Sequence, residues 1–179
     1  MTTEELEKLK YPIGKFDCPL DASEQKVSDW ISIIEHLPNR LINLVENFDQ
    51  KQLDTPYRPE GWTVRQVVHH LPDSHMNAYI RFKWALTEES PLIKAYHEDR
   101  WAELPDSRGP VEPSLNMLQS LHEKWVYLLK GMTPEKLSRS YMHPESGENI
   151  LKNVIGMYAW HGNHHFTHIQ NLAKREGWI

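Results

Sequence analysis

Apolar residues recur every three or four positions in four long segments of the chain. This spacing places them on one face of a helix. The pattern predicts helices from about residue 21–23 to 45, and over 64–87, 114–130 and 149–175. Thr63 and Gln66 have the spacing of a capping box at the start of the second helix, and Ser114 is the expected cap of the third. Strand-like alternation of useful length is absent from the sequence. We therefore expect an all-α protein, a four-helix bundle.

Two prolines fall inside the predicted helices. A proline removes one backbone donor and clashes with the preceding turn. Pro38 therefore predicts a kink or break in the first helix near His36 and Leu37, with two shorter helices as the alternative. Pro72 predicts a bend in the second helix just after His69 and His70.

The remaining segments are rich in proline and lack a sustained period. Residues 1–20 are expected to form an extended N-terminal arm that lies on the body of the protein. Residues 90–113 contain four prolines and form a long crossover connection, with at most a short helical turn at 98–104. Residues 143–149 are expected to be a loop. The length of 179 residues fits one domain that spans the whole chain.

Charge and cysteine content exclude several classes of protein. The 20 Lys and Arg against 25 Asp and Glu give a net charge of −5, which offers no basic surface for nucleic acid. The sequence has no apolar stretch of about 20 residues and no secretory signal, so we expect a soluble cytoplasmic protein without membrane contact. Cys18 is the one cysteine, which excludes zinc sites built from several thiolates. Histidines and carboxylates would have to hold any metal.

Histidine is abundant, with 11 residues, and four of them lie within eight positions of the last helix. Residues four apart lie one above the other on a helix, which pairs His161 with His165 and His164 with His168. The apolar stripe of this helix runs through Val154, Met157, Tyr158 and Leu172. His161 and His165 continue that stripe, so we expect this pair to face inward.

The second predicted helix supplies a third inward histidine. His70 follows Val67 by three residues and continues the apolar stripe, whereas His69 lies about 100° away around the helix. Three imidazoles from two helices leave one position of a tetrahedral metal open, as in catalytic zinc sites. The alternative is that these histidines are stacked in the core or lie on a solvated face.

Three motifs resemble the DinB-like proteins, and within them the YfiT branch. They are YPIGKF at 11–16, GWTVRQVVHHLPDSHMNAYIRFKWALTE at 61–88 and WHGNHHFTHI at 160–169. The resemblance covers essentially the whole chain. It implies a four-helix bundle of unusual connectivity, a homodimer, and one divalent metal per chain held by His70, His161 and His165. Other DinB-like proteins have glutamine where His168 stands, which leaves its role open.

The expected function is metal-dependent hydrolysis of a small substrate. Neutral imidazoles leave the full charge on the ion and lower the pKa of a bound water toward about 7. Zinc is the expected ion, with nickel, manganese or iron as alternatives. Asp73, His75 and His168 are candidates for orienting a ligand or transferring protons. The alternatives are an S-transferase that uses a low-molecular-weight thiol cosubstrate, and a metal-binding stress protein with an occluded site and no turnover.

Overall fold

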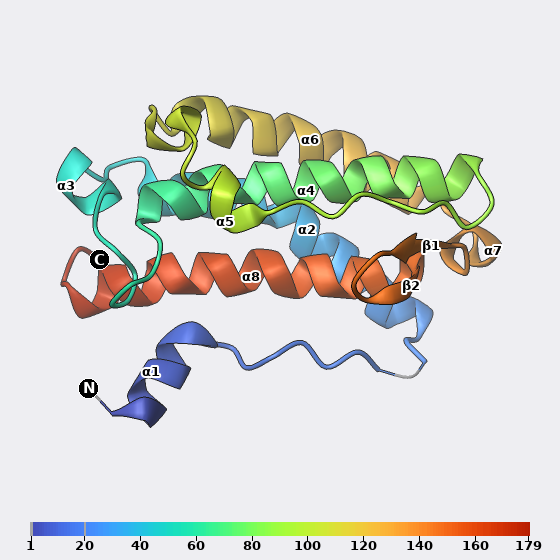
Figure 1. Ribbon diagram of the computed structural model, residues 1–179, viewed down its shortest axis with the longest axis horizontal. Coiled ribbons are helices and arrows are strands. Elements are labelled where there is room, and N and C mark those ends of the chain that lie inside the picture. Colours follow the sequence, from blue (N-terminus) through green and yellow to red (C-terminus); the bar gives the residue numbers. More distant parts are fainter. Residues whose placement is uncertain (1, 20) are drawn as a thin grey trace.

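A computed structural model of the protein describes residues 2–19 and 21–179. Its body is a bundle of four long helices, α2 (Glu24–Val45), α4 (Val64–Thr87), α6 (Glu112–Lys130) and α8 (Leu151–Arg175), as shown in Figure 1. The predicted four-helix bundle is confirmed. Helices α2 and α4 each pack against both α6 and α8. The two helices that follow each other in sequence therefore occupy opposite corners of the bundle.

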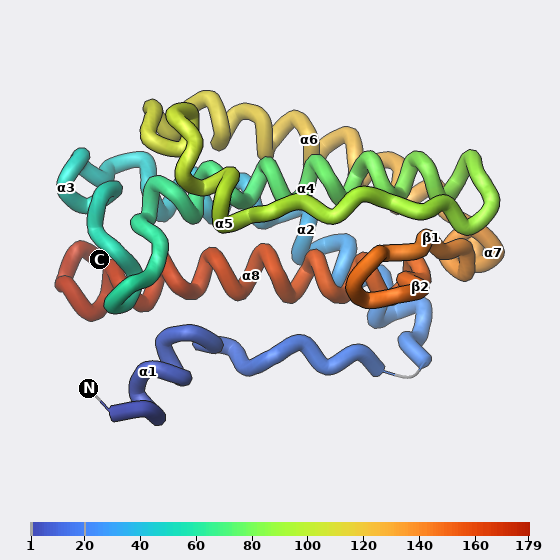
Figure 2. The backbone as a smooth tube through the Cα atoms, in the orientation of Figure 1, coloured from blue at the N-terminus to red at the C-terminus, as the bar shows by residue number. Residues whose placement is uncertain are grey.

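The order of the helices requires a long return connection. Helices α4 and α6 run in the same direction. Residues 88–111, which connect them in the sequence, therefore lead the chain back along α4 (Figure 2). This connection contains the short helices α5 (Glu98–Trp101) and η1 (Pro105–Arg108). The predicted crossover is confirmed. The connection from α2 to α4, residues 46–63, contains the four-residue helix α3 (Gln50–Leu53).

Among the described residues, side chains cap the N-termini of α2 and α4 but not those of α6 and α8. Thr63 and Gln66 form the predicted capping box of α4. Ser114 is not the cap of α6, because that helix begins at Glu112 with Pro113 in its first turn, where a missing N–H costs nothing. Both α2 and α4 continue through their prolines, so the alternative of two shorter helices at Pro38 is wrong. Leu37 and Leu41 are buried on either side of Pro38, and their packing keeps the helix continuous.

The N-terminal segment differs from the extended arm that the sequence predicts. Helix α1 spans Thr3–Lys10 and begins with a capping box between Thr2 and Glu5. The chain beyond α1 is extended and runs beside α8 (Figure 1). The indole Nε1 of Trp160 donates a hydrogen bond to the carbonyl of Gly14 at 3.2 Å, which fixes the extended part to α8.

A small hairpin accompanies the helical bundle and corrects the prediction of a loop at residues 143–149. Strands β1 (Ser140–His143) and β2 (Gly147–Ile150) pair antiparallel, with Ser140 opposite Ile150. The short helix α7 (Pro134–Leu137) precedes the hairpin. Four-residue strands are too short for alternation to be recognised, and the segment expected to be a loop forms most of the hairpin. Helix α8 accordingly begins at Leu151 and not at Asn149.

The core of the bundle consists of two apolar clusters. One lies toward the hairpin and includes Trp30, Phe82 and Trp125, and the other surrounds Leu41 and Leu118. Two fully buried imidazoles, His75 and His122, pack against Trp125 of the first cluster. Because each long helix keeps a polar outer face, none of the helices described in the structure is long and apolar enough to cross a membrane.

Gly156 lets α2 and α8 approach closely, since a Cβ there would lie 2.8 Å from two carbon atoms of the Trp30 ring. We expect Gly156→Ala to destabilise the protein. Overpacking costs roughly 1–3 kcal/mol, and this outweighs the gain of about 1 kcal/mol in helix propensity. Urea denaturation measures the change. Gly131→Ala is the control, because its Cβ would meet the Leu128 carbonyl at an ordinary 3.5 Å. A Gly156→Ala variant more stable than the wild type would contradict this account of the helix contact.

Candidate metal centre

Three histidines converge where α4 faces α8. His70 comes from α4, and His161 and His165 lie one turn apart on α8. One ring nitrogen of each lies within 4.8 Å of those of the other two. The Nε2 atoms of His70 and His161 are 3.2 Å apart. These are the three histidines that the helical pattern selects, and the structure brings them together.

The geometry and chemistry of this cluster fit a divalent metal ion. Two nitrogens that bind a tetrahedral zinc at about 2.0–2.1 Å lie about 3.3 Å apart, close to the 3.2 Å between His70 and His161. The Nδ1 atom of His165 is buried and has no hydrogen-bond partner among the described residues. Imidazole suits zinc, nickel and iron. The three residues can therefore hold one such ion.

Burial keeps these rings neutral, which is the form that binds a metal. Burial lowers the pKa of His70 to about 4. Burial, and then the neighbouring imidazoles, hold the pKa values of His161 and His165 well below the ordinary histidine value. At neutral pH each ring therefore offers a lone pair.

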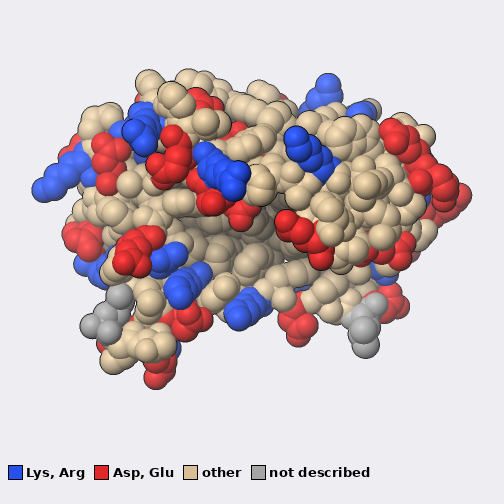
Figure 3. Space-filling model, viewed as in Figure 1, with Lys and Arg blue, Asp and Glu red and all other residues tan. Residues whose placement is uncertain are grey.

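A pocket of about 310 Å³ opens beside the three histidines and is also lined by Trp62, Ser74, Tyr96 and Glu98. The surface is hollowed between α5 and the N-terminal arm in Figure 3. Tyr96 and Glu98 come from the crossover connection. Burial raises the pKa of the Tyr96 hydroxyl, which keeps it protonated as a hydrogen-bond donor. The sequence did not single out these two residues, although connections as long as this one are often functional.

The predicted accessory residues occupy three different surroundings. Asp73 is half-buried but does not line the pocket, and burial together with Asp106 raises its pKa to about 6. His75 is fully buried behind the cluster, where its Nε2 lies 3.2 Å from Nδ1 of His161. His168 donates from Nε2 to the carbonyl of Lys10 at 3.1 Å and holds the end of α1. Of the three, His75 is the one that contacts a residue of the cluster through a hydrogen bond.

The other histidines near the cluster have separate partners. His69 lies 2.7 Å from the hydroxyl of Ser114 through Nδ1, so its ring turns toward α6. His164 stacks on Trp160 with ring centroids 4.6 Å apart. Neither belongs to the converging group, in agreement with the helical pattern.

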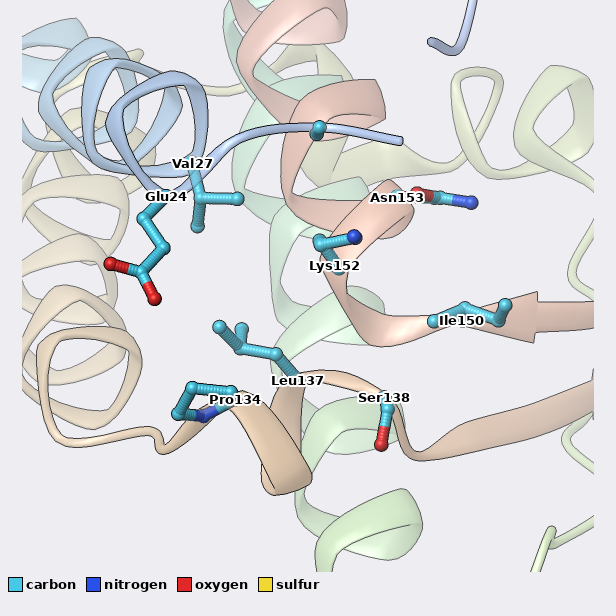
Figure 4. A pocket seen from close by; sticks show the side chains of 9 residues that line it. Glu24, Val27, Pro134, Leu137, Ser138, Ile150, Lys152 and Asn153 are labelled. Atoms are coloured by element: carbon cyan, nitrogen blue, oxygen red, sulfur yellow. The ribbon is translucent and has the colours of Figure 1, made fainter. Parts of the chain in front are cut away.

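A second pocket lies at the hairpin end of the bundle and has a different character. Its volume is about 370 Å³, and Figure 4 shows Val27, Leu137 and Ile150 around it with Glu24 and Lys152. Within the described part of the chain, the one cluster of three or more metal-binding side chains is that of His70, His161 and His165. The candidate metal ligands therefore lie where α4 faces α8 and not at the hairpin end of the bundle.

The fold and the three-histidine cluster define a class of protein. The DinB superfamily model matches residues 33–169, and the chain belongs to that superfamily. The resemblance that the sequence motifs indicate is confirmed.

Particular relatives narrow the comparison. A protein of Bacillus cereus (strain 03BB102) named "Putative metal-dependent hydrolase" is 57% identical over 170 residues, which cover 95% of this chain and 98% of the relative. A Bacillus anthracis (strain A0248) protein of the same name is 56% identical over the same length. Among solved structures, YfiT from Bacillus subtilis is described as "a probable metal-dependent hydrolase with an unusual four-helix bundle topology". It is 46% identical, with a TM-score of 0.93 over 96% of this chain and 99% of YfiT. The four-helix bundle protein TT2238, with a TM-score of 0.56 at 18% identity over 81% of this chain and 98% of its own, shares the fold.

We expect the metal-free protein to lose stability as the pH falls from 7 toward 4. His70 and His122 have pKa values of about 4 in the folded protein, against about 6.5 in an unfolded chain. The unfolded chain therefore binds more protons in this window, and acid favours it. Asp73, with its raised pKa of about 6, acts in the opposite direction but is a single group.

Urea denaturation in the presence of a chelator at pH 7, 6 and 5 measures this dependence. Asp73→Asn removes the opposing carboxyl group and should make the loss steeper. A free energy of unfolding that stays constant or rises on acidification would show that the buried imidazoles do not control the stability.

Proposed function

We propose that the protein is a metal-dependent enzyme that hydrolyses a small substrate, with one zinc ion held by His70, His161 and His165. The observation that carries the proposal is the meeting of three neutral imidazoles at an open pocket. The names of the relatives from Bacillus support the same class of activity. Three protein ligands with a fourth position open to the pocket are the arrangement of hydrolytic zinc sites.

A bound divalent ion would supply Lewis acidity and lower the pKa of a water ligand toward about 7. The chain supplies the other groups that hydrolysis needs. The protonated hydroxyl of Tyr96 can donate a hydrogen bond to an oxygen on which negative charge develops. The carboxylate of Glu98, which lines the same pocket, can accept and return a proton. Trp62 forms an apolar wall against which a substrate can pack.

The shape of the site favours turnover over storage. A storage or stress protein would enclose its metal with side chains, whereas these histidines border a pocket of about 310 Å³. That volume accommodates a small molecule. The pocket would also admit a thiol, so an S-transferase activity is the competing outcome of the activity test below.

We expect about one zinc per chain after reconstitution, and loss of the metal in His70→Ala, His161→Ala and His165→Ala. Removing one of three protein ligands leaves too few donors to hold the ion. Mass spectrometry of the metal content, with circular dichroism to confirm the helices, measures this result. His69→Ala is a matched control, because His69 is adjacent to His70 but is bonded to Ser114 and should leave the zinc in place. Full retention of zinc in the three ligand variants would refute the site.

We expect the zinc-loaded protein to hydrolyse a model ester or phosphodiester, such as p-nitrophenyl acetate or bis(p-nitrophenyl) phosphate, without any thiol. Tyr96→Phe should retain zinc but lower kcat roughly 10²–10³-fold, because a donor to the developing charge is lost. Tyr127→Phe is the control, because Tyr127 is 86% exposed. Consumption of chlorodinitrobenzene only when a thiol is added, with no ester or phosphodiester hydrolysis, would replace the hydrolase with a thiol S-transferase.

A further inference from the structure

A chain of three hydrogen-bonded imidazoles crosses the core behind the metal centre. The Nδ1 atom of His161 lies 3.2 Å from Nε2 of His75. The Nδ1 atom of His75 lies 2.8 Å from Nε2 of His122, whose own Nδ1 lies 2.6 Å from the carbonyl oxygen of Ile34. These four residues come from α8, α4, α6 and α2 in turn. The chain therefore connects every long helix of the bundle.

Pro38 explains why the carbonyl of Ile34 is available. In a regular helix this oxygen accepts a bond from the N–H four residues later, and residue 38 is a proline, which has no N–H. Helix α2 continues through Pro38 all the same. The His122 ring supplies the donor that the helix lacks, so the buried carbonyl keeps a partner.

The carbonyl at the end of the chain fixes the direction of every bond. A carbonyl oxygen only accepts, so Nδ1 of His122 must carry the proton. A neutral imidazole has one N–H, which leaves Nε2 of His122 as an acceptor for Nδ1–H of His75. By the same rule Nε2 of His75 accepts from Nδ1–H of His161. The Nε2 atom of His161 is then left with a lone pair, and it is this atom that faces His70.

The surroundings of the chain support neutral rings. His75 and His122 are 0% and 1% exposed. Trp125 and Tyr158 pack edge-on against His75 with ring centroids 5.9 and 5.1 Å away. Among the described residues, neither His75 nor His122 forms a hydrogen bond with a carboxylate. The carbonyl of Ile34 therefore determines which nitrogen of each imidazole is protonated.

We infer that His75 and His122 are positioning residues, which hold His161 in the tautomer protonated on Nδ1 and thereby present Nε2 to the metal. This inference rests on the proposed metal-dependent function. Outer partners of metal-binding histidines are commonly a carboxylate or a backbone carbonyl. Here one backbone carbonyl of α2 determines the tautomer of His161 on α8 through two intervening imidazoles.

Zinc affinity of the whole protein, measured by competition with a chromophoric chelator, tests the inference. His75→Phe keeps a ring in the core but removes both hydrogen-bonding nitrogens, and we expect a 10–100-fold loss of affinity. His75→Gln should recover most of the affinity, because its amide oxygen can accept from His161 and its N–H can donate to His122. Tyr158→Phe is the control, since Tyr158 packs against His75 but lies outside the chain, and it should bind zinc like the wild type.

Nitrogen-15 NMR of the histidine rings gives a readout that packing alone would not change. In the metal-free wild type we expect Nδ1 of His161, His75 and His122 to be protonated and each Nε2 to be unprotonated. A proton on Nε2 of His161 would overturn the inference. Zinc binding by folded His75→Phe with wild-type affinity would also overturn it, while leaving the proposed function intact.

The two proposals can fail separately. A wild-type protein that binds no zinc refutes the proposed function, but the tautomers of the metal-free protein still report on the chain. If His75→Phe does not fold, the wild-type NMR spectrum and His75→Gln still decide the inference. Loss of affinity in His75→Phe without recovery in His75→Gln, together with a wild-type spectrum that lacks the expected tautomers, would assign His75 a packing role only.

Discussion

The cost of burying imidazole rings is the constraint on which the rest of the structure depends. An unpaired polar group in a protein interior costs about 1–3 kcal/mol, and a charged one costs more. The bundle buries several histidines at its centre, so they are neutral and most of their buried nitrogens have partners. The hydrogen bonds from His161 to Ile34 connect all four long helices. Sliding any helix by one turn of 5.4 Å would therefore break this series of hydrogen bonds. Hydrogen bonding therefore adds to apolar packing in setting how the helices align.

The connectivity of the bundle builds the remaining wall of the pocket. Since α4 and α6 run in the same direction, the chain must return over the length of α4 before α6 can begin (Figure 1). That return carries Tyr96 and Glu98 to the open side of the three histidines. A short hairpin between antiparallel helices would leave this side bare. The same topology thus accounts for the long connection and for the polar groups beside the three histidines.

The features that depend on a single helix could be predicted from the sequence. The stripe on α8 selects His161 and His165 over His164, and the stripe on α4 selects His70 over His69, because each choice concerns the face of a single helix. Tyr96 and Glu98 could not be placed from the sequence, since their position depends on the path of the crossover. The capping box of Thr2 and Glu5 is a local sequence pattern that indicates the start of a helix. The prolines that follow it favoured an extended arm instead.

The contact of His122 with α2 is a feature that could not be predicted from the sequence. It continues the apolar stripe of α6 between Leu118 and Trp125, which marks it as a buried histidine, and Pro38 marks a helix with an unpaired carbonyl. Each signal is visible in the sequence, but their connection requires α2 and α6 to be neighbours. The resulting imidazole chain holds His161 on the core side of the three-histidine cluster, whose other side borders the pocket lined by Tyr96 and Glu98. A small molecule in this pocket would therefore reach the three histidines without any separation of the four helices.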